Sequence, residues 1–230
     1  MSKQYNAALG QYDRDHLHSA PEAVEVLAGF PAKKFDEGVD LVVRLGVDPR
    51  KAEEMVRGTI SLPSGTGKDV RVAVFAQGEA AQAARDAGAE FVGADDLAAE
   101  VEGGMMDFDV AIAAPDMMPT VGKLGRALGP RGLMPNPKTG TVTPDVAKAV
   151  QEFKGGKVEY RTDRFGNVHV PIGKRSFTSD ALLANLHALI GELVRVKPSA
   201  AKGRYIRKVV LSSTMSPGIK IDPSKVTTED

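Results

Sequence analysis

The chain lacks cysteine, long hydrophobic runs and any excess of charge of one sign. Without cysteine there is no disulfide framework and no thiol chemistry. No stretch approaches the roughly 18 uninterrupted apolar residues of a membrane span. The first residues show neither the apolar run nor the cleavage pattern of a signal peptide. These absences predict a soluble cytoplasmic protein that makes no membrane contact.

Charge is balanced overall but unevenly distributed. Thirty basic and thirty acidic residues give a net charge of zero, which argues against a nucleic-acid binder because such proteins are often strongly basic. Residues 158–230, however, carry 12 basic and 7 acidic residues, a local net charge of +5, and the stretch from Leu193 to Ile221 holds seven cations without an acid. Screening removes distant charges within about 10 Å, so such local patches govern attraction to phosphate.

The most distinctive segment is KLGRALGPRGLMPNPKTGTVT, from Lys123 to Thr143. It holds four glycines, three prolines and no acidic residue. Because its glycine and proline pairs forbid a continuous helix or a central strand, we expect a long, shaped loop, and long loops in compact domains are usually functional or disordered. The unneutralised cations predict contact with a phosphate backbone; they are Lys123, Arg126, Arg131 and Lys138.

Two glycine-rich joints, residues 63–67 and 155–156, divide the chain. Between them strands and helices alternate, which predicts parallel strands with covering helices; the strands are expected at 70–76, 90–94 and 109–115, and the helices at 79–88 and 95–104. Outside them we expect strands at 39–47, 57–63 and 205–213, a hairpin of 157–162 with 167–173, and a helix at 179–196 that is capped by Ser179 or Asp180. The pattern indicates a discontinuous α+β domain with an inserted α/β domain and a two-stranded hinge.

Signals for enzyme chemistry are weak. The run SGTGK at residues 64–68 resembles part of a phosphate-binding loop, but Leu62 and Asp69 replace the glycine and hydroxyl residue of the full pattern. Four histidines lie scattered at 16, 18, 169 and 187, without metal-ligand spacing, so no metal site is predicted. Asp107 and Asp109 are expected on the same face of a strand, so a general acid/base pair formed by these two carboxylates remains an alternative. A solvated strand end is the simpler interpretation.

Four further blocks, in order along the chain, resemble a known family. They are KKFDEGVDLVVRLGVDPRKAEEMVRGTISLP from Lys33, MDFDVAIAAPDMM from Met106, GKVEYRTDRFGNVHVPIGKRSF from Gly156 and KPSAAKGRYIRKVVLSSTM from Lys197. Together with the glycine- and proline-rich segment they are similar to the bacterial L-one family of large-subunit ribosomal proteins. The resemblance implies a two-layer α+β domain from residues 1–66 and 156–230, carrying the main ribosomal RNA site, and a Rossmann-like three-layer α/β domain at 67–155.

The resemblance also implies binding residues. By motif, the family's main RNA site falls on Lys34, Phe35, Thr214 and Met215, with Lys174 from the GKRSF block beside it. From residue type alone, Phe35 as a core residue behind solvated lysines remains an alternative. Where the family usually has glycine after Thr-Met, this chain has Ser216. Neighbouring cations and hydroxyls complete the expected site, because they suit phosphates and ribose 2′-hydroxyls; they are Lys33, Lys202, Arg204 and Ser213.

The expected function is that of a structural constituent of the large ribosomal subunit. As the resemblance implies, the chain would bind ribosomal RNA to form the mobile stalk, assist release of the exit-site tRNA, and repress translation of its own messenger RNA. It would use no cofactor and no small-molecule substrate, and the cations of the loop would make secondary RNA contacts. The alternatives are a nucleotide-dependent enzyme that uses Asp107 or Asp116 of the inserted domain, and a protein–protein scaffold.

Overall fold

The structure, a computed structural model, describes residues 3–226. The chain divides into two compact units. The terminal unit comprises Met1–Gly67 and Val158–Asp230, and the middle unit comprises Lys68–Lys157. Each unit has its own hydrophobic core. No helix among the described residues combines the length and apolar character needed to cross a bilayer.

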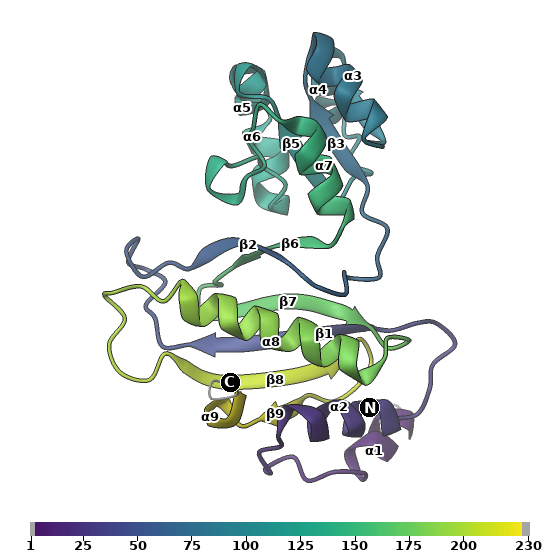
Figure 1. Ribbon diagram of the computed structural model, residues 1–230, viewed down its shortest axis with the longest axis vertical. Helices are drawn as coiled ribbons and strands as arrows, with labels where there is room; N and C mark the ends of the chain where they lie inside the picture. Colours follow the sequence, from purple (N-terminus) through teal and green to yellow (C-terminus); the bar gives the residue numbers. More distant parts are fainter. Residues whose placement is uncertain (1–2, 227–230) are drawn as a thin grey trace. The chain divides into compact units, whose positions relative to one another are not determined.

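The terminal unit contains a four-stranded antiparallel sheet in the order β7-β1-β8-β9, and a separate pair, β2-β6. Figure 1 shows α8 lying along the sheet. The strands are β1 (Gly38–Leu45), β2 (Arg57–Ser61), β6 (Lys157–Arg161), β7 (Asn167–Lys174), β8 (Ile206–Ser213) and β9 (Ile219–Ile221). The helices are α1 (Lys3–Leu9), α2 (Ala20–Gly29), α8 (Ser179–Arg195) and α9 (Pro223–Val226).

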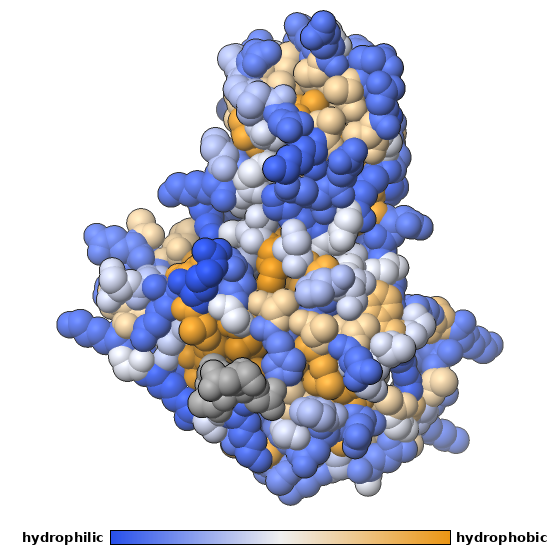
Figure 2. All heavy atoms as spheres, in the orientation of Figure 1, coloured by the Kyte–Doolittle hydropathy of each residue, from blue (hydrophilic) through white to orange (hydrophobic). Residues whose placement is uncertain are grey.

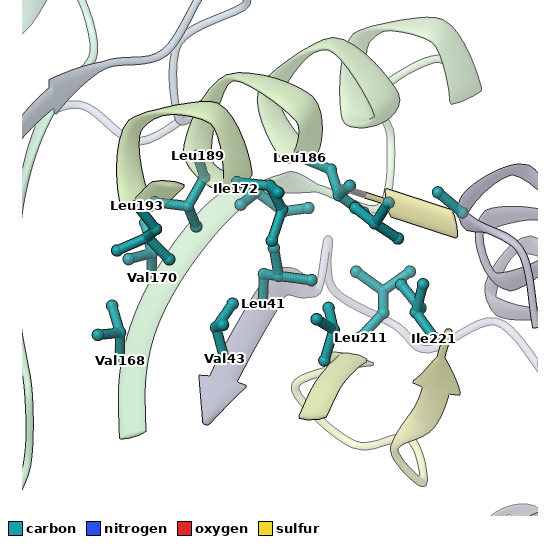
Figure 3. Close-up of a cluster of buried hydrophobic side chains, with 14 of the residues drawn as sticks. Leu41, Val43, Val168, Val170, Ile172, Leu186, Leu189, Leu193, Leu211 and Ile221 are labelled. Carbon is teal, nitrogen blue, oxygen red and sulfur yellow. The ribbon is translucent and has the colours of Figure 1, made fainter. Parts of the chain in front are cut away.

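One face of the sheet is buried, because apolar residues alternate along its strands. In β1 the pattern places Val39, Leu41, Val43 and Leu45 inward. Their neighbours come from β7, from β8 and from the apolar stripe of α8, as Figure 3 shows for Val170, Leu211, Leu186, Leu189 and Leu193. Figure 2 shows hydrophobic residues gathering around α8 and the strands next to it on the face drawn. The sheet and α8 therefore form the rigid frame of this unit.

Two details of the terminal unit differ from the expectation. The cap of α8 is Thr178, whose side chain accepts the N–H of Ala181, and neither Ser179 nor Asp180. The expected hairpin of 157–162 with 167–173 is wrong as well: β6 pairs with β2, and only the single bridge from Thr162 to Val168 joins it to β7. β6 stays with β2 because Thr162, which follows β6, donates both its N–H and its hydroxyl to the carbonyl of Val56, just before β2.

The middle unit is built on a three-stranded parallel sheet in the order β4-β3-β5. All four residues of β3 are buried, as the apolar run predicts for a central parallel strand. The mixed α and β class is thus confirmed, whereas the Rossmann-like, three-layer detail stays a prediction. The strands are β3 (Val72–Phe75), β4 (Phe91–Gly93) and β5 (Val110–Ala113); the helices are α3 (Gly78–Asp86), α4 (Asp95–Glu102), α5 (Met118–Lys123), α6 (Gly125–Leu128) and α7 (Val146–Lys154).

The first joint is anchored by a buried side chain of α8. Asn185 is 0% exposed, and its Oδ1 accepts the N–H of Ser64 at 3.0 Å. Its Nδ2 donates to the carbonyl of Gly65 at 2.9 Å and to that of Ile172, in β7, at 2.7 Å. One amide therefore ties the glycine-rich joint to both the sheet and its covering helix. A buried amide of this kind is retained because all its polar atoms have partners.

We predict that Asn185→Ala lowers the free energy of unfolding of the terminal unit by about 1 to 3 kcal/mol, because backbone groups at the joint lose their partner. Urea unfolding followed by tyrosine fluorescence reports this unit alone, since all four tyrosines, Tyr5, Tyr12, Tyr160 and Tyr205, lie within it. The control is Asn6→Ala on the exposed surface of α1, which should be nearly neutral. Equal effects of the two substitutions would show that the anchor contributes nothing.

Candidate RNA interface

Three segments of the terminal unit converge at one edge of the four-stranded sheet. They are the approach to β1, the end of β7 and the end of β8. The antiparallel register brings them together, because Gly38 lies opposite Lys174 and Val39 lies opposite Ser213. We call this convergence the Glu37 junction; it comprises residues 33–38, 174–176 and 213–216.

A buried carboxylate holds the junction together. Glu37 is 1% exposed and accepts from Arg175 Nη1 at 2.9 Å. The same carboxylate accepts the hydroxyl of Ser213 at 3.1 Å and the backbone N–H of Met215 at 2.9 Å. A buried charge is tolerated when it is paired and its remaining lone pairs are bonded, as they are here.

Arg175 extends this network to α2. Its guanidinium also donates to the carbonyls of Ala28, Phe30 and Pro31, at the end of α2 and just beyond it. The backbone N–H of Arg175 donates to the carbonyl of Glu37 at 2.8 Å. The planar, multiply donating guanidinium suits a residue that must join one carboxylate to several carbonyls.

Short polar contacts fix the rest of the junction. Asp36 accepts the N–H and the hydroxyl of Ser176 at 3.0 and 2.7 Å. The backbone of Thr214 donates to the carbonyl of Gly38 at 3.0 Å, and its hydroxyl accepts the N–H of Gly38 at the same distance. Ser216, where the family usually has glycine, folds its hydroxyl back to accept the N–H of Ser213 at 2.8 Å. The side chain of Ser216 therefore serves the turn itself.

Two large apolar side chains project from this fixed base. Phe35 is 54% exposed and Met215 is 53% exposed, so the alternative that placed Phe35 in the core is wrong. Lys34 is exposed, Lys174 is partly exposed, and Lys33 donates to Gln4 Oε1 at 2.6 Å. Ser213 is buried and bonded to Glu37, so it supports the surface from beneath. Phe35 and Met215 are thus exposed apolar side chains in a junction that also carries exposed charge.

The structure does not bring Lys202 and Arg204 to the junction. Both are exposed in the connection that leads into β8. That connection lies at the opposite end of β1, where the N–H of Gly46 donates to the carbonyl of Tyr205. Eight residues of β8 separate the two ends, which corresponds to roughly 24 Å of strand. These two cations would need a separate part of a bound ligand.

In the middle unit, the segment expected to be one long loop is a series of short helical turns. α5 and α6 are followed by 3-10 turns at Gly129–Arg131 and Pro137–Thr139. Each of these turns begins near a proline and ends at a glycine with positive φ, Gly132 at 72° and Gly140 at 68°. The expectation failed because proline is favourable in the first turn of a helix and interrupts only its interior.

All four cations of this segment are exposed, and none forms an ion pair within residues 3–226; they are Lys123, Arg126, Arg131 and Lys138. Their backbone is held by a local polar network. Asn136 accepts the N–H of Lys138 at 2.8 Å and donates its own N–H to Thr141 at 2.7 Å. The cations are therefore presented on an ordered surface of the middle unit.

The residues considered for enzyme chemistry do not assemble into a site. Asp107 precedes β5 and Asp116 follows it, so they lie at opposite ends of one strand. Asp109 pairs with Lys68 at 2.7 Å and Arg71 at 3.3 Å. Partial burial alone would raise the pKa of Asp109, but these hydrogen bonds hold it below its ordinary value. A carboxylate that is paired with two cations and has a lowered pKa is a poor general acid.

The phosphate-loop resemblance at residues 64–68 is not supported either. A phosphate loop leads directly into the N-terminus of a helix, whereas this run leads into β3. Gly65 and Gly67 adopt positive φ values of 67° and 66°. The polar backbone of Ser64 and Gly65 is bonded to Asn185. The two glycines thus serve the joint.

The histidines are not all scattered as the sequence suggested. His16 and His18 lie together with Glu22, and their potential ligand atoms are all within 4.8 Å of one another. The other two remain apart: His169 contacts Asp163 at 3.4 Å, and His187 lies in α8. The sequence analysis missed the cluster because Glu22 belongs to the first turn of α2, and no helix was expected in that part of the chain.

Comparison with known proteins gives a consistent result. Residues 27–217 match the model of the ribosomal protein L1p/L10e family. The chain is similar to the large ribosomal subunit protein uL1 of Cutibacterium acnes, with 61% identity over 96% of each chain. It is also similar to the proteins of that name from Nocardioides, with 57% identity over 97% of this chain and 93% of the relative, and from Thermobifida fusca, with 58% identity over 97% and 95%. This chain therefore belongs to the ribosomal protein L1p/L10e family and is a structural protein rather than an enzyme.

Proposed function

We propose that this chain is a cytoplasmic component of the large ribosomal subunit that binds large-subunit ribosomal RNA through the Glu37 junction. Support for the subunit comes from its relatives, which carry the name of a large-subunit protein over nearly their full length. Support for the binding site comes from the terminal unit, where Phe35 and Met215 stand exposed beside a rigid ion pair, an arrangement that serves contact with a ligand better than it serves the fold.

Phe35 and Met215 carry the proposal. An exposed aromatic ring offers a stacking surface for an unpaired base, and a thioether adapts to an irregular base face. The bond from the Met215 N–H to Glu37 fixes the chain on which Met215 stands. Binding to a rigid surface loses less conformational entropy than binding to a mobile one. We therefore expect unpaired RNA bases to stack on Phe35 and Met215, on a surface that is already ordered before the RNA binds.

Polar groups around the two apolar side chains would contact the RNA backbone. Lys34, which is exposed, and Lys174, which is partly exposed, add positive charge to the junction. Thr214 is exposed, and its hydroxyl keeps further hydrogen-bonding capacity beside the bond to Gly38. Phosphate contacts supply affinity, and 2′-hydroxyl contacts distinguish RNA from DNA. The junction therefore suits a folded, partly single-stranded RNA element.

The middle unit would supply a second, weaker RNA surface. The four exposed cations of its glycine- and proline-rich segment, Lys123, Arg126, Arg131 and Lys138, form no ion pair among the described residues, so their charge is available to phosphate. In the assembled stalk this surface would meet additional ribosomal RNA or the exit-site tRNA and assist release of that tRNA. The free protein would bind its own messenger RNA through the same Glu37 junction and repress translation. Lys202 and Arg204 would contact RNA that lies beyond the minimal fragment bound by the Glu37 junction.

We predict that Phe35→Ala weakens binding of a stalk-region ribosomal RNA fragment by about 1 to 3 kcal/mol, the range for removal of a base–aromatic stack. Filter binding or fluorescence anisotropy at fixed salt measures this change. The free energy of unfolding should barely change, because the ring is more than half exposed.

The matched control is Phe165→Ala. Phe165 is 69% exposed and lies in the turn before β7, next to the end of β1 that is far from the junction. Its removal should leave the dissociation constant unchanged within twofold. If both substitutions weaken binding equally, or neither does, the junction is not the RNA site.

We predict a different effect for the double substitution Arg126→Gln with Arg131→Gln. Binding to the minimal RNA fragment should stay near normal, because the main contact is in the terminal unit. On the full stalk RNA, the plot of log affinity against log salt should flatten by about 0.7 to 0.9 for each phosphate that the protein no longer neutralises. The control pair, Arg85→Gln with Lys148→Gln on α3 and α7, should keep the wild-type slope. If the slope is unchanged for Arg126→Gln with Arg131→Gln, these two arginines face solvent and contact no phosphate.

A further inference from the structure

The cluster of His16, His18 and Glu22 lies at the start of α2, apart from the residues of the Glu37 junction. The two imidazole rings have centroids 4.6 Å apart and meet edge to face. The potential ligand atoms of all three residues lie within 4.8 Å of one another. Two imidazoles and a carboxylate at this spacing form a ligand set that zinc and related transition-metal ions accept.

The backbone fixes His18 in this position. Its N–H donates to the carbonyl of Lys220 at 3.0 Å, and its carbonyl accepts the N–H of Asp222 at 2.9 Å, so it forms a parallel bridge with β9. His18 is 8% exposed, and its Nε2 is buried without a hydrogen-bond partner in the described residues. An unpaired buried polar atom is costly, and its presence in a native fold calls for a ligand or another reason.

The helix cap orients Glu22. Its Oε2 accepts the backbone N–H of Ser19 at 2.8 Å, and the hydroxyl of Ser19 accepts the N–H of Glu22. The pair forms a capping box. The backbone hydrogen bond from Ser19 engages only Oε2. This bond leaves Oε1 available, in the way that an outer hydrogen bond orients a metal-ligating carboxylate.

We propose that His16, His18 and Glu22 form a binding site for a divalent transition-metal ion of the zinc type. His18 and Glu22 are held by their backbone contacts, while the exposed side chain of His16 closes onto the ion. Ligand atoms around tetrahedral zinc lie about 3.4 Å apart, so the side chains would draw closer together around a bound ion than the present limit of 4.8 Å. Water fills the fourth position, because His16 and Glu22 both face solvent.

The charges around the site are mixed. Lys225, in α9, acts on Glu22 and opposes a cation, whereas Lys220 is already paired with Asp15 at 2.8 Å. A bound ion would join the segment before α2 to the helix itself and, through the backbone of His18, to β9. The ion would thereby stabilise the native state in proportion to its concentration and affinity.

The test is calorimetric titration of the metal-stripped full-length protein with zinc chloride. The expected result is one equivalent of Zn²⁺ per chain, with His16→Gln and Glu22→Gln each weakening binding at least tenfold. His16 is exposed, so its replacement does not threaten folding; His18 is buried and is therefore not the test position. The control His169→Gln removes an exposed histidine outside the cluster and should bind zinc like the wild type.

Cobalt provides a second measurement that reports ligation directly. Co²⁺ added to the stripped protein should give visible absorption bands of a tetrahedral site, and the bands should be absent for His16→Gln. Zinc should also raise the melting temperature of the wild type and leave that of His16→Gln unchanged. Absence of stoichiometric binding, or equal zinc affinity for the wild type and both cluster variants, would overturn the proposal.

Discussion

The buried ion pair of Glu37 and Arg175 is the interaction on which the proposed interface depends. Its 2.9 Å contact lies where the ends of β7 and β8 meet the approach to β1. Removal of one partner from such a pair leaves a buried charge uncompensated, which costs about 3 to 5 kcal/mol. Because Glu37 also bonds the N–H of Met215, the pair positions the exposed surface as well as joining three segments.

The fold determines where the residues of the candidate interface lie. Alternating apolar residues bury one face of β1 against α8 and set the register of its neighbours. That register brings Lys174 and Ser213 to the start of β1. Glu37 is then buried, while Phe35, two residues earlier, remains exposed. Asn185 holds the first joint to the same frame, so the interface and the joint share one rigid support.

Local patterns predicted much of this structure, and non-local contacts account for what they missed. Buried strands such as β3 and the long helix α8 were expected from their apolar periodicity. The motif residues Thr214 and Met215 are bonded to Gly38 and Glu37, close in sequence to Phe35, whereas Lys202 and Arg204 lie at the other end of β1. Helix α2 was missed although Ser19 and Glu22 form a readable capping box. Burial of Glu37 depends on strand register, which a single sequence does not display.

The most direct test of the central claim is the methyl spectrum of the protein labelled with ¹³C-methyl methionine, recorded with and without a stalk-region ribosomal RNA fragment. The resonance of Met215 is assigned through its loss in Met215→Leu. If the Glu37 junction binds the RNA, this resonance shifts or broadens when one equivalent of RNA is added. The five methionines of the middle unit should stay in place; they are Met105, Met106, Met117, Met118 and Met134. An unmoved Met215 with shifts among those five would contradict the account and assign the main RNA contact to the middle unit.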